Sequence, residues 1–304
     1  MIFAVAIIFS GTGCKTATEP SETLESFEIQ KTDLVIDPEY DSDPSWSPDG
    51  KMIAFESKRD GNWEVYTVNI DGSGLTNLTN NPADDTDPFW SPDGKKIAFT
   101  SYRDGKGEIY VLGTEGSSLT NLTNNPADDS NPSWSPDGHK IAFNSYRDNN
   151  TEIYVMNSDG SGQTNLTRNQ TADDGYPSWS PDGMFITFES NRDGNWEIYK
   201  MNADGSGLTN LTNNKEATDG TTSWSPDGKM IVFNSYQNGN WEIYKMNADG
   251  SGLTNLTNNP SDDSYPYWSP DGMLIAFESG REGLNEIYIM KADGSEQKKL
   301  VTEK

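Results

Sequence analysis

The sequence contains very few of the residues from which catalytic and metal sites are usually built. Its 304 residues include one Cys and one His. A Ser-His-Asp triad or a multi-His metal site therefore cannot be assembled without inventing partners. His139 occupies a turn position that holds Lys in three other repeats, which indicates an exposed turn residue. We expect no catalytic residues, no cofactor and no metal, and predict that the protein is not an enzyme.

Positive charge is also scarce, because 22 Lys and Arg face 48 Asp and Glu, for a net charge of -26. Binding to nucleic acid needs clustered Lys and Arg, so nucleic acid is excluded as a partner. The folded body is not expected to bind an anionic membrane surface, for the same reason. We interpret the acidic surface as a source of solubility.

Long hydrophobic runs are missing after the first residues. Residues 2–9 form an apolar run too short to span a bilayer, and small residues followed by Cys14 end it. This pattern resembles a bacterial lipoprotein signal. We predict a signal peptide over 1–14, lipidation at Cys14 and a polar tether over 15–28. The protein would then be exported to the periplasm or cell surface and touch the membrane through this lipid alone; an ordinary cleaved signal with an incidental Cys is the alternative.

What the sequence does contain is a repeat. The motif Trp-Ser-Pro-Asp-Gly, or a close variant, recurs with Trp residues 44 or 45 positions apart. Each repeat then reads as a strand ending at the Trp, a Ser-Pro-Asp-Gly turn, a strand with Ile-x-Phe, a strand with Glu-Ile-Tyr and a strand within Leu-Thr-Asn-Leu-Thr. The motif Trp residues are Trp46, Trp90, Trp134, Trp179, Trp224 and Trp268.

The Ile-x-Phe segment indicates how the repeats pack. A small or apolar residue stands between Ile and Phe in every repeat, so both faces of each sheet must be covered. Small four-stranded antiparallel sheets that are buried on both faces and recur at this spacing are typical of a propeller. We predict an all-β, six-bladed β-propeller over 29–304, acting as a monomer. Residues 33–37 and 298–302 both resemble a fourth strand, and which of them closes the ring stays open.

Two charged positions recur around the repeat. An Asp lies five residues before each Trp, and an Arg follows the second strand in five repeats, with Gln237 in the remaining one. In an up-and-down blade the two positions emerge on the same side, so we predict structural ion pairs between loops. A charged rim that grips a partner is the alternative. The residues are Asp41, Asp85, Asp129, Asp174, Asp219, Asp263, Arg59, Arg103, Arg147, Arg192 and Arg281.

The acidic turns allow a calcium interpretation as well. The segments 202–207 and 247–252 partly match a calcium loop but lack its final Glu, so a tight hairpin is the simpler interpretation. Weak calcium binding by surface pairs such as Asp84 and Asp85 stays open.

The positions that differ between repeats are better candidates for binding. They lie one and three residues before the Trp, where the first strand would line a central channel. We predict that Phe89, Tyr176, Tyr265, Tyr267, Asp43 and Asp87 form a partner-binding surface at its mouth; the alternative is packing between neighbouring loops.

Together these motifs resemble the TolB-type propeller, a family with WD-like repeats, over residues 33–302. The resemblance implies a periplasmic protein that binds an envelope lipoprotein. The N-terminal α/β domain of that family is not expected here. We therefore predict an exported scaffold that binds a protein or peptide in the cell envelope. The alternative is a hydrolase or lyase acting on saccharide or peptide, with a site of carboxylates and Tyr at the channel mouth.

Overall fold

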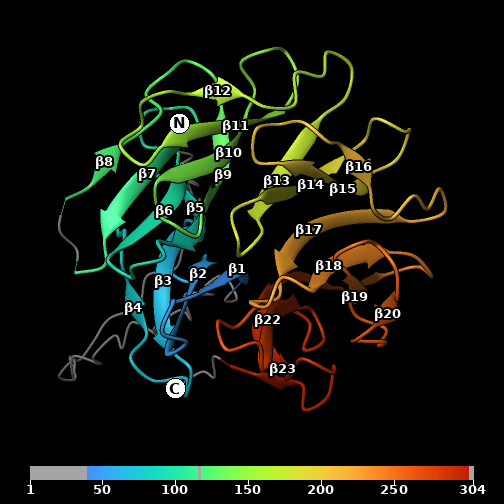
Figure 1. Cartoon of the computed structure of the whole chain (residues 1–304). Helices are drawn as coiled ribbons and strands as arrows, with labels where there is room; N and C mark the ends of the chain where they lie inside the picture. Colours follow the sequence, from blue (N-terminus) through green and yellow to red (C-terminus); the bar gives the residue numbers. More distant parts are fainter. Residues whose placement is uncertain (1–39, 116–117, 301–304) are drawn as a thin grey trace, which may run out of the picture. The chain divides into compact units, whose positions relative to one another are not determined.

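Each repeat folds into one antiparallel sheet of four strands joined in chain order, which confirms the predicted six-bladed β-propeller (Figure 1). The computed structural model describes residues 40–115 and 118–300. These residues belong to one compact unit, Ile36–Lys304. We number the blades 1 to 6 in chain order, starting with β1–β4.

The strands have equivalent bounds in the six blades. The innermost strands are β1 (Asp41–Trp46), β5 (Asp85–Trp90), β9 (Asp129–Trp134), β13 (Asp174–Trp179), β17 (Thr218–Trp224) and β21 (Asp263–Trp268). The second strands are β2 (Met52–Ser57), β6 (Lys96–Ser101), β10 (Lys140–Ser145), β14 (Phe185–Ser190), β18 (Met230–Tyr236) and β22 (Leu274–Ser279). The third strands are β3 (Glu64–Asn69), β7 (Glu108–Gly113), β11 (Glu152–Asn157), β15 (Glu197–Asn202), β19 (Trp241–Asn247) and β23 (Glu286–Lys291). The outermost strands are β4 (Thr76–Asn77), β8 (Thr120–Asn121), β12 (Thr164–Asn165), β16 (Thr209–Asn210), β20 (Thr254–Asn255) and β24 (Lys298–Lys299).

The Ser-Pro-Asp-Gly segment makes the turn between the first two strands. In blade 1 the N–H of Gly50 donates to the carbonyl of Ser47 at 2.9 Å, and Gly50 has a φ of 70°. The hydroxyl of Ser47 donates to the carboxylate of Asp49 and accepts the N–H of Met52 at 2.9 Å. The turn is therefore fixed by its own side chains, and its role is structural.

The hydrophobic core consists of one cluster for each contact between neighbouring blades. Ile53 and Phe55 pack with blade 6, whereas Ala54, which lies between them on β2, packs with blade 2. The same division recurs around the molecule, so each sheet is covered on both faces as the Ile-x-Phe pattern predicts. A single blade cannot bury both faces alone, and its stability depends on its neighbours.

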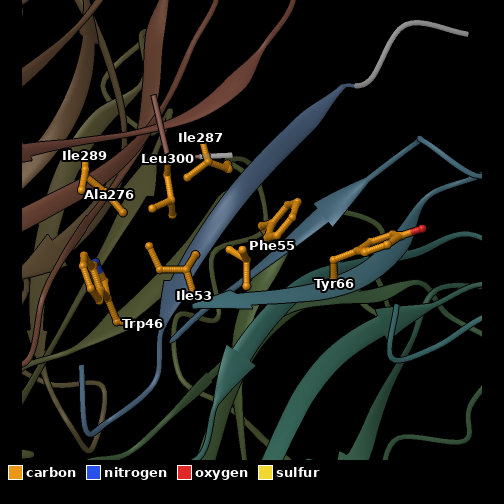
Figure 2. Packing of buried hydrophobic residues seen from close by; sticks show 9 residues of the cluster. Trp46, Ile53, Phe55, Tyr66, Ala276, Ile287, Ile289 and Leu300 are labelled. Atoms are coloured by element: carbon orange, nitrogen blue, oxygen red, sulfur yellow. The ribbon is translucent and has the colours of Figure 1, made fainter. Parts of the chain in front are cut away.

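The ring closes between blades 6 and 1 by the same contacts that join the other blades. Figure 2 shows Trp46, Ile53 and Phe55 of blade 1 in one cluster with Ala276, Ile287 and Ile289 of blade 6. The N–H of Asp41 donates to the carbonyl of Asn285 at 2.9 Å. An equivalent bond joins Asp85 to Trp63 and Asp129 to Gly107. The closing contact is therefore one more copy of the standard contact between blades.

The outermost strands are shorter than the sequence suggests. The Leu-Thr-Asn-Leu-Thr segment predicts a full fourth strand, but β4 has two residues. The reason lies in Asn77, whose side-chain oxygen accepts the N–H groups of Thr79 and Asn80 at 3.1 and 3.0 Å. This turn directs the chain away from the sheet. In blade 6 the outermost strand is β24, which pairs with β23.

Some expectations concern parts of the chain that are not described. Cys14, the signal peptide over 1–14, the tether over 15–28 and the segment 33–37 lie outside the described residues. No helix among residues 40–115 and 118–300 is long and apolar enough to cross a membrane.

Candidate functional site

Every innermost strand contains a bulge three residues before its Trp. The pairing of β1 with β2 is irregular between Ser42 and Ser45, and Asp43 within this interval has a φ of 48°. Non-glycine residues rarely adopt this left-handed conformation, and β-branched and bulky residues do so least readily. It recurs at φ values between 37° and 54° in all six blades, at Asp43, Asp87, Asn131, Tyr176, Thr221 and Tyr265.

These bulges place side chains from different blades around one central pocket of about 40 Å³. Asp43, Asp87, Asn131, Tyr176 and Thr221 line it at the bulge position. Phe89 and Tyr267 line it from the position before the Trp, and their rings meet edge to face at 5.4 Å. Of the predicted binding residues, the central pocket therefore brings together Asp43, Asp87, Phe89, Tyr176 and Tyr267.

Some aromatic residues of the site pack against the hydrophobic core, and others contact one another at the pockets. Phe89 and Tyr267 are half-buried and pack against the cores of the neighbouring contacts. Tyr176 and Tyr265 contact each other, with ring centroids 6.2 Å apart. Packing, the alternative named from the sequence, thus describes part of the role of Phe89 and Tyr267.

A second set of residues at this site is not apparent from the repeat motif. It is the position directly after Ile-x-Phe on each second strand, where the residues are polar although the preceding Phe is buried and apolar. Its signal in the sequence is variation within an otherwise constant strand. The set comprises Glu56, Thr100, Asn144, Glu189, Asn234 and Glu278.

Four of these polar residues accept a backbone N–H from the bulge of the next blade, and they are Glu56, Thr100, Asn144 and Glu189. Glu56 accepts the N–H of Asp87 at 3.0 Å, and Asn144 accepts the N–H of Tyr176 at 3.0 Å. Glu189 accepts the N–H of Thr221 at 3.3 Å. They therefore support the backbone that positions the pocket residues.

Three carboxyl groups lie close together at the central pocket. One oxygen each from Asp43, Glu56 and Asp87 lies within 4.8 Å of the others. Burial and then repulsion from Asp87 raise the pKa of Asp43 and of Glu56 well above their usual values. Burial also raises the pKa of Asp87.

Carboxylate oxygens at such distances are ligands that calcium prefers. However, oxygens of this trio already accept hydrogen bonds. Asp87 accepts the hydroxyl of Thr100 at 2.6 Å and the amide of Asn131 at 2.9 Å, and Glu56 accepts the N–H of Asp87. We therefore assign no ion to the trio.

A larger pocket of about 480 Å³ lies beside the central one, and we call it the side pocket. It shares Tyr176 and Thr221 with the central pocket. Its other walls come from blades 4, 5 and 6, and they include Glu189, Asn234, Trp196, Trp241 and Tyr265. Burial raises the pKa of Glu189 to about 7.

The recurring Asp and Arg residues form a separate structural unit in five blades. In blade 1 the Nη2 of Arg59 lies 2.8 Å from Asp41, and its guanidinium lies over the ring of Tyr66 at 5.0 Å. The corresponding Asp–Arg distances are 3.0, 2.8, 2.8 and 3.0 Å in blades 2, 3, 4 and 6. These Asp side chains are fully buried, so they are not available to a partner at the surface.

Blade 5 differs because Gln237 replaces the Arg. The hydroxyl of Ser235 donates to Asp219, which is buried without an ion pair among the described residues. Burial raises the pKa of Asp219 to about 6.

Comparisons with known proteins agree with this architecture. The family model described as "TolB beta propeller domain" matches residues 22–131, 120–222 and 209–304. No curated protein matches the chain. A solved structure from Agrobacterium tumefaciens, described as a candidate TolB, is 28% identical with a TM-score of 0.67, covering 84% of this chain and 91% of that one.

Two further solved structures resemble the chain in fold. TolB from Acinetobacter baumannii is 22% identical with a TM-score of 0.65, covering 85% of this chain and 62% of that one. An oligogalacturonate lyase in complex with manganese is 19% identical with a TM-score of 0.60, covering 86% of this chain and 78% of that one. The same propeller architecture thus occurs in proteins with different activities.

Proposed function

The chain belongs to the TolB beta propeller domain family, and we propose that it is an exported scaffold that binds a protein or peptide segment in the cell envelope. The segment would lie across the central pocket and enter the side pocket. Export and attachment through a lipid on Cys14 are part of this proposal, as is action as a monomer.

One observation carries the proposal. The six blades are nearly identical in their turns, cores and contacts, yet they differ at the positions that line the two neighbouring pockets. Asp43 and Asp87 stand where other blades have Asn131, Thr221 or Tyr265. A scaffold needs uniform residues to close its ring, whereas recognition of an asymmetric segment needs uneven ones. This difference supports a binding role at the pockets.

Site-specific photocrosslinking tests the binding role. The photoreactive residue p-benzoylphenylalanine replaces Tyr265 in the side pocket, and in a control chain it replaces Leu253, which is 52% exposed on a hairpin outside the pockets. In cells of the source organism we expect a discrete crosslinked product from position 265 and none from position 253. Equal products from both positions, or none from position 265, would contradict the proposal.

Attachment to the membrane is tested separately. Cys14→Ser should move the protein from the membrane fraction to the soluble envelope fraction. Retention of the variant in the membrane fraction would contradict lipidation at Cys14.

A hydrolase or lyase acting on saccharide or peptide is the second candidate, and one observation favours it. Burial raises the pKa of Glu278 to about 7, as it does for Glu189, and such carboxyl groups suit acid–base catalysis near neutral pH. Turnover of neutral oligosaccharides or peptides that is abolished in Glu278→Gln and in Glu189→Gln would establish it. The scaffold proposal expects no turnover.

A further inference from the structure

Carboxyl groups lie in and beside the side pocket. Glu189 lines it, and Asp43 and Asp87 line the central pocket, which shares Tyr176 and Thr221 with it. Among the described residues, the walls of the two pockets include no Lys, Arg or His. A positively charged group entering the side pocket would therefore meet the carboxyl group of Glu189 without a competing cation on the walls.

Glu189 has an oxygen available for such a group. Its Oε2 accepts the N–H of Thr221 at 3.3 Å, and the described residues form no other hydrogen bond to it. An N–H donor from a ligand can therefore bind Oε1 without displacing a partner.

Asn234 provides a second and independent indication of a ligand. This residue lines the side pocket, and it is 6% exposed. Its Oδ1 is buried without a hydrogen-bond partner among the described residues. The equivalent oxygen of Asn144 accepts the N–H of Tyr176, so the unpaired state is peculiar to this blade. An unpaired buried acceptor costs free energy, which a donor from a ligand would relieve.

The aromatic walls fit the same kind of group. The residue before the Glu of each third strand is Trp in blades 1, 4 and 5, and Trp196 and Trp241 of blades 4 and 5 line the side pocket. Tyr176 and Tyr265 provide two more rings. A cation near an indole face is stabilised by the negative face of the ring, and Arg adds stacking.

We propose that the side pocket binds the guanidinium or ammonium group of an Arg or Lys residue of a peptide segment, with Glu189 as the charged partner and Trp196 and Trp241 as the aromatic walls. This inference rests on the proposed function and names the chemistry of its ligand. A neutral saccharide would also use aromatic walls, but it would leave the concentration of carboxyl groups at the two pockets without a role.

Isothermal titration calorimetry at pH 8 and low salt tests the inference with defined probes. The probes are acetyl-Gly-Arg-Gly-amide, its citrulline counterpart, which is similar in shape but uncharged, and maltotriose. We expect saturable binding of the Arg peptide and about tenfold weaker binding of the citrulline peptide, because a charge-assisted pair is lost.

Matched variants locate the site. Glu189→Gln should weaken binding of the Arg peptide about tenfold. Glu115→Gln makes the same change at an exposed position of blade 2, outside both pockets, and should leave binding within about threefold of wild type, as expected for a distant charge. A second pair is Trp241→Leu, which should weaken binding, and Trp63→Leu, which should not. If a Gln variant does not fold, the two Trp variants still test whether the side pocket binds the Arg peptide.

Four results would overturn the inference: no saturable binding of the Arg peptide, equal binding of the citrulline peptide, tighter binding of maltotriose, or equal losses in both members of each variant pair. Photocrosslinking at position 265 distinguishes an error in the ligand chemistry from an error in the scaffold function. If a crosslinked product forms while the Arg peptide fails to bind, the ligand chemistry is wrong and the scaffold function stands. If neither occurs, both are refuted.

Discussion

The missing arginine of blade 5 gives the sharpest prediction. In the other blades, Arg Nε donates to a Ser hydroxyl and Nη2 to both oxygens of the buried Asp, as Arg59 does with Ser57 and Asp41. Blade 5 retains the remainder of this arrangement, because Ser235, Asp219, Phe233 and Tyr244 occupy the corresponding positions. Gln237→Arg should therefore restore the ion pair and the stacking.

The expected gain depends on pH, and its sign follows from Asp219. Burial raises the pKa of Asp219 to about 6 from an ordinary value of 3.8. A raised carboxyl pKa means that the folded state binds the proton more tightly than the unfolded state. The resulting stabilisation of the wild type is fully present below about pH 4, and it is lost as the pH rises to about 6. Above that range the folded state contains a buried carboxylate without a cation.

The magnitude follows from the size of this shift. A difference of about two pKa units corresponds to about 3 kcal/mol, which is the upper limit of the gain from a fully compensating Arg at pH 8. At pH 5 the wild type already recovers about 1.4 kcal/mol by protonation, so the advantage of Gln237→Arg should shrink by that amount.

Urea unfolding at pH 8 measures the full gain in stability from Gln237→Arg, and urea unfolding at pH 5 measures how far protonation of Asp219 reduces that gain. The control is Gln170→Arg, which adds the same charge at an exposed position and reports the general benefit of reducing the net charge of -26. Arg103→Gln is the converse variant, and it should lower the free energy of unfolding at pH 8 by about 3 kcal/mol or more, because it leaves Asp85 buried and unpaired. If Gln237→Arg stabilises no more than Gln170→Arg, or by the same amount at both pH values, the reasoning is refuted.

Two further predictions concern contacts between blades. Thr187→Val preserves the shape of the side chain but should lower the free energy of unfolding by about 1–3 kcal/mol. The reason is that the hydroxyl of Thr187 accepts a hydrogen bond from Nε1 of Trp224 at 3.1 Å and forms another with the hydroxyl of Thr222 at 2.7 Å. A neutral effect in denaturant titration would show that Trp224 and Thr222 find other partners. Gly160→Ala should cost about 1–3 kcal/mol more than Gly105→Ala. Both residues have positive φ, but a Cβ on Gly160 would lie 2.5 Å from the carbonyl oxygen of Leu122 in blade 2, whereas one on Gly105 meets nothing within 4 Å; equal costs by thermal unfolding would contradict the close contact.

The repeat made the fold predictable because its signals are local and recur. The Ser-Pro-Asp-Gly turn encodes a hairpin, and the Ile-x-Phe pattern encodes two buried faces. The length of the outermost strands was not predictable in this way. There the side chain of Asn77 competes with strand pairing for the backbone of Thr79 and Asn80, and a propensity for extended structure does not reveal that competition.

The candidate site was predictable only in part. The uneven residues three positions before the Trp indicated the central pocket, and the structure places Asp43, Asp87 and Tyr176 there. Glu56, Glu189 and Glu278 were missed because a polar residue within a buried strand gives no sign of its partner. That partner is in the next blade, about thirty residues further along the chain for Glu56 and Asp87.

Blade 5 shows why differences between repeats are more informative than the repeat itself. In four of the other blades the Arg is followed by an Asp that accepts the hydroxyl of the third-strand Tyr, as Asp60 does with Tyr66. Blade 5 has Gln237 followed by Asn238, so the cation and one of two acids are lost together. Asp41, Arg59 and Asp60 carry one net negative charge, and Asp219 with two neutral residues carries the same. The local charge is thus unchanged while one carboxyl group becomes sensitive to protonation near pH 6. If this local charge balance determines stability, the double variant Gln237→Arg with Asn238→Asp should be more stable than Gln237→Arg alone. A less stable double variant would show that the ion pair stabilises blade 5 without the acid that follows the Arg.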